Sequence, residues 1–147
     1  MKTIFDETTT DELIKRISML HENSKARWGK MTVYQMLKHS TLWEEMISSD
    51  RKYKRMLLGR LIGKMTLKNL IKDEKPMSHN MPTVPGFSIT GHGDVLSEKK
   101  KWIAMVEEHA RFSNVDFIHP FFGKMTKEQI GYLAYKHTDH HLRQFNC

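Results

Sequence analysis

The sequence predicts an all-α domain, and three observations lead to this prediction. Apolar residues recur at three- and four-residue spacings in four separate segments, which is the pattern of amphipathic helices. Two of these segments begin with the same aromatic-GKMTxxQ motif, in which glutamine follows threonine by three residues and signals a helix start. The chain of 147 residues is also long enough to close one hydrophobic core without disulfide bonds. We therefore expect a single domain over residues 1–147.

The first two helices are expected near the N-terminus. Thr9 and Glu12 have capping-box spacing, which predicts a helix from about Thr10 to Glu22. Thr32 and Gln35 repeat this spacing and predict the start of a second helix. The apolar stripes expected to face the core are Leu13, Ile14, Ile17 and Leu20 in the first helix, and Met36, Leu37, Trp43, Met46 and Ile47 in the second.

A short basic helix is expected next. The segment from Arg51 to Lys72 contains eight basic residues and no acidic residue, so it carries more than the whole formal net charge of +7. Its apolar residues share one arc of a helical wheel, with basic residues flanking them. We expect that apolar arc to pack on the bundle and the basic residues to be solvated. The residues of the arc are Leu57, Leu58, Leu61, Ile62 and Met65.

A long loop and two more helices complete the expected fold. Prolines and glycines between Asp73 and Asp94 rule out a long helix there and predict an irregular segment that covers one end of the bundle. Ser97 is the expected cap of the next helix, and Thr126 begins a last helix that runs toward Phe145. The core stripe expected between them is Trp102, Met105, Val106, His109 and Phe112, and the loop residues His79 and His92 are expected to be solvated.

Three histidines are candidates for a metal site. His39 lies seven residues after its capping threonine and His137 lies eleven residues after its own, so the two side chains have a similar phase in their helices. His141 lies one turn beyond His137. Three imidazole nitrogens can hold a divalent ion at about 2.0 to 2.1 Å and leave coordination positions open. This arrangement is typical of a catalytic or ligand-binding metal site.

Spacing alone leaves the third ligand open. His140 and His141 lie three and four residues after His137, and both spacings place side chains on neighbouring turns. A histidine on an apolar helix face is also more often a hydrogen-bonded core residue than a ligand, and this is the expectation for His109. The HxxxH spacing of helical zinc pairs favours His141.

Longer motifs resemble a known family. The segments Trp28–His39, His119–Thr126 and Tyr135–Phe145 resemble the DinB-like (YfiT-like) superfamily, and more narrowly its DUF1569 branch. The resemblance covers nearly the whole chain, and the C-terminal HxxHHLRQF run is its most specific part. It implies an up-down-down-up four-helix bundle that holds nickel, zinc or a similar ion. The ligands it implies are His39, His137 and His141. We then expect His140 to lie beside the site and to orient the substrate or a ligand.

The resemblance implies a metal-dependent hydrolase or a thiol-dependent transferase that acts on a small molecule. The divalent ion would lower the pKa of a bound water or bind a low-molecular-weight thiol as thiolate. No catalytic residue is assigned, because Glu44, Glu45 and Asp139 are expected to be solvated surface charges. Some members of the superfamily form dimers, so a homodimer is a candidate assembly.

Two functions without catalysis remain open for this protein. In one, residues 51–72 dock on nucleic acid or an anionic surface. In the other, the protein is a scaffold or a dimerisation unit. Tyr53 is the only aromatic residue in the basic segment, so this segment offers few side chains on which bases could stack, and no specific nucleic acid is expected.

No membrane partner is expected either, because the most apolar window, Met56–Met65, is too short to span a bilayer. A cytoplasmic protein is expected, since no secretory signal is recognised and Cys147 is the only cysteine.

Overall fold

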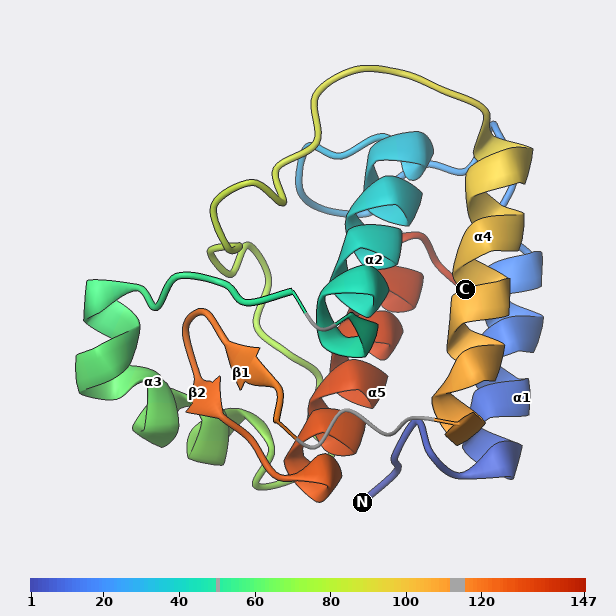
Figure 1. Ribbon diagram of the computed structural model, residues 1–147. Helices are drawn as coiled ribbons and strands as arrows, with labels where there is room; N and C mark the ends of the chain where they lie inside the picture. The colour runs from blue at the N-terminus through green and yellow to red at the C-terminus, as the bar shows by residue number, and fades with distance from the viewer. Residues whose placement is uncertain (50, 112–115) are drawn as a thin grey trace.

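The computed structural model describes all residues except 50 and 112–115 (Figure 1). The described part is mostly helical, with five α-helices, one short 3-10 helix and a two-stranded sheet, so the all-α expectation holds in its broad form. The small sheet was not predicted. Phe112, expected in the core, lies outside the described residues. The elements are α1 Glu7–Ser18, α2 Val33–Ser48, α3 Leu57–Leu70, α4 Val95–Glu108, η1 His109–Arg111, β1 Ile118–His119, β2 Gly123–Lys124 and α5 Lys127–Gln144.

Four of the helices pack around the hydrophobic core. The helices α4 and α5 each contact both α1 and α2, and α3 stands to one side of them with the β1–β2 hairpin (Figure 1). The predicted core stripes of α1 and α2 are largely confirmed, since only Ile14 is partly buried. Fully buried side chains in the core include Leu13, Ile17, Met36, Leu37, Met46, Ile47, Trp102 and Leu142.

The helix starts confirm two of the four predicted caps. Thr32 and Thr126 each accept a hydrogen bond of 3.2 Å from a glutamine backbone amide, and the glutamine side chain accepts one of 3.0 Å in return. The other two helices begin earlier than predicted. Asp6 and Asp94 are their caps, because each carboxylate accepts from the third helical amide and is favoured by the positive end of the helix dipole.

The segment between α3 and α4 is irregular, as predicted. It places the Phe87 side chain in the core, where it is 7% exposed. His79 and His92 are exposed as expected, but His79 also stacks on Trp28, with ring centroids 3.9 Å apart. None of the described helices has the length and apolar character needed to cross a membrane.

The orientation of α3 contradicts the prediction. The helix turns Gly59, Gly63 and Leu67 toward the hairpin, and its apolar arc faces away from the protein. A glycine without a side chain lets two backbones approach closely, so the glycine face, and not the leucine face, makes the contact. The exposed fractions on the outer face are 79% for Leu57, 57% for Leu58, 83% for Leu61, 37% for Ile62 and 63% for Met65.

We expect Gly63→Ala to lower the free energy of unfolding by about 1 to 3 kcal/mol. A Cβ atom at this position would overlap with the backbone carbonyl of Phe121, which cannot move aside as a flexible side chain would. Urea unfolding followed by circular dichroism measures the change. Asn69→Ala, at an exposed position of the same helix, is the control and should change stability by less than about 0.5 kcal/mol. Unchanged stability in Gly63→Ala would mean that α3 is held loosely.

Candidate metal centre

Three buried histidines meet between α2 and α5. One nitrogen from each of His39, His137 and His141 lies within 4.8 Å of the others, so that together they can hold a metal ion. The ring centroids are 4.6 to 5.2 Å apart. Each side chain is less than a tenth exposed. The structure thus brings together the three residues that the sequence singled out.

Hydrogen bonds orient two of these rings. The Nδ1 atom of His39 contacts the backbone carbonyl of Phe87 at 2.9 Å, and Nδ1 of His141 contacts Oε1 of Gln144 at 3.0 Å. Carbonyl oxygens only accept, so each Nδ1 carries the proton and donates it. In a neutral ring this leaves a lone pair on Nε2. Both Nε2 atoms are therefore ready to bind a cation.

The third ring is placed by stacking. His137 stacks on Trp43, with centroids 4.5 Å apart and planes 26° apart. Its Nε2 lies 3.1 Å from Nε2 of His39. Two nitrogens bound to one ion at about 2.0 to 2.1 Å lie about 3 Å apart when the angle between the bonds is close to tetrahedral or smaller. The observed separation therefore fits a shared metal ion.

Burial keeps the three imidazoles neutral. It lowers the pKa of His39, lowers that of His141 to about 3 and lowers that of His137 well below its ordinary value of 6.5. The mutual repulsion of the rings adds to this effect for His137 and His141. Metal ions bind the neutral form of histidine, so the donor set fits a divalent cation.

His140 lies beside this cluster, with its ring centroid 5.2 Å from that of His141, and it also has neighbours outside the cluster. It is 9% exposed, and its ring contacts Trp28 and His79 at centroid distances of 5.8 and 6.4 Å. Burial lowers its pKa, and the nearby His79 lowers it further. Of the two adjacent histidines that spacing left open, His141 is the one whose nitrogen lies with those of His39 and His137 in the described structure.

Two of the three acidic residues near the ligands are not the surface charges that we expected. Glu44 is 1% exposed and lies 2.7 Å from His109, and Asp139 is 7% exposed and pairs with Arg16 and Arg143 at 2.8 and 2.7 Å. Each carboxylate tolerates burial because it has a hydrogen-bonded partner. His109 is the hydrogen-bonded core residue that we predicted. Glu45 remains on the surface, paired with Lys101.

Sequence reasoning missed three residues around the site. The backbone of Phe87 and the side chain of Gln144 orient the ligands. Gln144 could have been found from its spacing, since it follows His141 by three residues. Nδ1 of His119 accepts hydrogen bonds of 3.1 Å from two backbone amides, so its proton is on Nε2. That Nε2 is buried without a hydrogen-bond partner in the described structure, and burial lowers the pKa of His119 to about 3.

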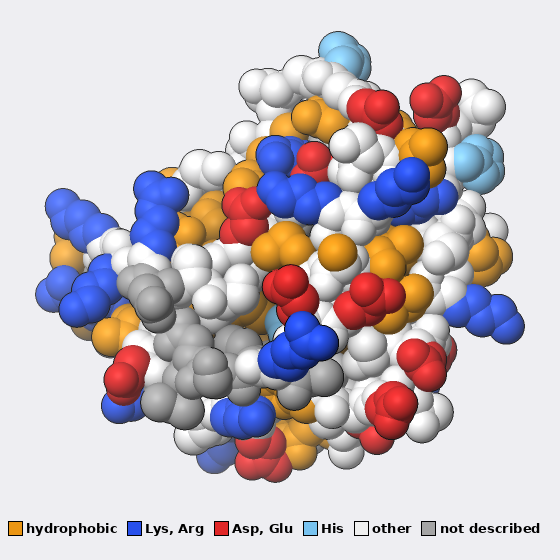
Figure 2. All heavy atoms as spheres, turned by 45° about the vertical axis from the view of Figure 1, so that its right-hand side comes forward, with side chains coloured by type: hydrophobic (Ala, Val, Ile, Leu, Met, Phe, Trp, Pro, Cys, Tyr) orange, Lys and Arg blue, Asp and Glu red, His pale blue; other side chains and the backbone are white. Residues whose placement is uncertain are grey.

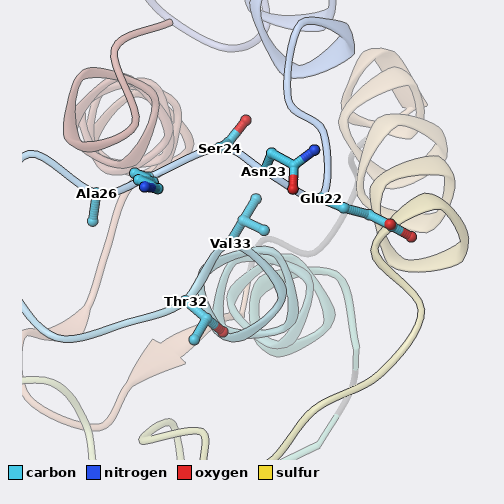
Figure 3. A pocket seen from close by; sticks show the side chains of 7 residues that line it. Glu22, Asn23, Ser24, Ala26, Thr32 and Val33 are labelled. Carbon is cyan, nitrogen blue, oxygen red and sulfur yellow. The ribbon is translucent and has the colours of Figure 1, made fainter.

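A pocket of about 380 Å³ lies elsewhere, where the chain enters α2 (Figure 3). None of the three clustered histidines lines it. The lining residues are Glu22, Asn23, Ser24, Lys25, Ala26, Thr32 and Val33.

Comparison with known proteins gives a family but no function. The model of a family described as a protein of unknown function (DUF1569) matches residues 3–147. No curated protein and no solved structure matches the chain. The chemistry must therefore be argued from the site.

Proposed function

The chain belongs to the DUF1569 family, and we propose that it is a metal-binding protein in which His39, His137 and His141 hold one divalent ion. The observation that carries this proposal is the convergence of three buried, neutral imidazoles whose ligand nitrogens lie within 4.8 Å of one another. Imidazole ligands suit zinc and nickel, and we propose one of these as the ion.

The arrangement of the four packed helices goes beyond what membership of the family shows. We propose that residues 1–147 form one domain of the DinB-like superfamily, with α1, α2, α4 and α5 as an up-down-down-up bundle. Two observations support it. The helices α4 and α5 each pack on both α1 and α2, and the candidate ligands come from the second and the last of these four helices.

The proposed activity is hydrolysis or thiol-dependent transfer on a small molecule, with a low-molecular-weight thiol as a candidate partner. When bound, a divalent ion on three neutral imidazoles supplies Lewis acidity toward a water or a thiol. The protein's own part begins with orientation, since Phe87 and Gln144 hold two of the ligand rings. His119 lies in the same buried region, with its ring 5.4 Å from that of Trp43. Its Nε2 carries a proton and can donate a hydrogen bond to a bound molecule.

We expect protein purified without an affinity tag to contain about one divalent ion per chain, because the three nitrogens form one site. Elemental analysis by mass spectrometry gives the identity and the stoichiometry together. Burial lowers the pKa of all three ligands, to about 3 for His141, so the ion should stay bound as the pH falls through 6.5. It should be lost only as the pH approaches about 3, because protonated imidazole cannot coordinate. Protein that stays free of metal after dialysis against excess zinc and nickel would contradict the proposal.

A further inference from the structure

The outer face of α3 is an exposed apolar surface. Its five large apolar residues fall within an arc of about 140° when successive residues are placed 100° apart. Leu57 and Leu61 are about four-fifths exposed. Contiguous apolar surface of this kind on a water-soluble domain marks a site of interaction with something apolar.

Basic residues border one side of this apolar face. Arg60 borders the arc on one side and Lys68 lies two turns further along the helix, and both are exposed. The extended segment before the helix adds Arg51, Lys52 and Lys54, and no acidic residue occurs between residues 51 and 72. Figure 2 shows Lys and Arg side chains gathered with hydrophobic ones at the left-hand edge, where α3 lies. The partner must therefore be both apolar and anionic.

The fold holds α3 in this outward orientation. Gly59 and Gly63 lie against the backbone of Phe121, where no larger side chain would fit. Arg55 donates hydrogen bonds to the carbonyls of Gly59 and Phe121 at 3.1 and 3.4 Å, and Lys64 donates to the carbonyl of Lys124. These contacts fix the inner face, so the leucines of the outer face cannot turn inward without breaking them.

We propose that α3 docks this protein on the surface of an anionic lipid bilayer. An amphipathic helix that combines leucine-type residues with Lys and Arg lies in the plane of the interface, its apolar side chains in the acyl boundary and its cations on acidic headgroups. The helix stands clear of the four packed helices, at the edge of the molecule, where it can meet a flat surface (Figure 1). The expectation of no membrane partner was based on the length of helix needed to span a bilayer, and a helix that lies in the interface does not need that length.

Two other occupants fit less well. A second copy of the chain, docked face to face, would bring the same basic residues against each other. A nucleic acid would attract the cations but would leave the leucines without an apolar environment, and Tyr53, the aromatic residue of the segment, is half-buried near Phe87. Charge complementarity combined with apolar insertion therefore favours the bilayer.

Vesicle co-sedimentation with the full-length protein tests the proposal. Phosphatidylcholine vesicles that contain phosphatidylserine should bind the protein at least about tenfold more tightly than phosphatidylcholine alone, and high salt should abolish the difference. Leu61→Glu should weaken this binding about tenfold or more, because it places a charge in the acyl boundary. Arg60→Glu should weaken it several-fold.

The matched controls lie on α4. Leu96→Glu and Lys100→Glu make the same chemical changes at exposed positions of that helix and should leave vesicle binding unchanged. Circular dichroism shows whether each variant is folded. The proposal is overturned if the protein does not bind anionic vesicles, or if the α4 variants lose binding as much as the α3 variants. It is also overturned if the protein is a dimer that does not bind vesicles and Leu61→Glu converts it to a monomer, since α3 would then be the dimer interface. Retained binding in Leu61→Glu with loss in Arg60→Glu would also overturn it, since this pattern indicates a purely electrostatic polyanion site.

This surface and the histidine site can be judged separately. Vesicle binding is measured without reference to activity, and neither Leu61 nor Arg60 contributes to the histidine cluster. Failure of one proposal therefore leaves the other standing.

Discussion

His141→Ala is expected to weaken binding of zinc or nickel on the order of a thousandfold, whereas His140→Ala should keep most of it. The two residues are adjacent in the sequence and both are buried. A difference in metal affinity between the two variants therefore shows which side chain points toward the metal site. Nδ1 of His141 is held by Gln144, which leaves its Nε2 toward His39 and His137. The ring of His140 contacts Trp28 and His79 instead.

Isothermal titration of metal into the apo-protein measures both variants. Loss of a residue that supports a ligand can itself weaken metal binding by about 10- to 100-fold, so affinities must be compared, and not merely the presence of metal. His39→Ala and His137→Ala should match His141→Ala. If His140→Ala emptied the site while His141→Ala bound normally, the third ligand would have been assigned to the wrong residue.

Glu44→Ala is expected to lower the free energy of unfolding by about 3 kcal/mol. The Glu44 carboxylate lies 2.7 Å from Nε2 of His109 and accepts a hydrogen bond of 3.4 Å from the indole of Trp102. All three side chains are at most 4% exposed. Removing the carboxylate takes a partner from two buried donors and leaves a cavity between α2 and α4.

The neighbouring residue provides the control. Glu45 pairs with Lys101 at 2.5 Å, but both side chains are more than a third exposed, so Glu45→Ala should cost less than about 0.5 kcal/mol. Thermal or urea denaturation of the two variants gives the comparison. Equal stability losses would show that the buried pair of Glu44 and His109 contributes no more than a surface ion pair.

The sequence predicted local features well. The capping boxes at Thr32 and Thr126 depend on contacts within three residues, so spacing alone was enough to find them. The phase of His39 and His137 follows from the same caps, because a helix of known start fixes which residues share a face. Asp6 and Asp94 were missed because several residue types can cap a helix and nearby threonine and serine competed for the role.

Features that depend on tertiary packing could not be read from the pattern. The arc of α3 that a helical wheel marks as core is exposed, since the glycine face of the same helix makes a closer contact with the hairpin. Glu44 looked like a surface charge because its partner, His109, is 65 residues away. The assignment of His141 over His140 from the resemblance remains a prediction until metal affinities are measured.

The separation of the histidines along the chain has a consequence for how the site assembles. His137 and His141 belong to one helix, which can form on a microsecond timescale without the rest of the protein. His39 is 98 residues from His137, so it joins them only after a long chain segment has closed and its entropy has been lost. We therefore expect a refolding chain to offer a two-nitrogen chelate first and a three-nitrogen site last. A metal ion bound early by His137 and His141 would favour closure of the chain between His39 and His137, because His39 could then bind to the same ion.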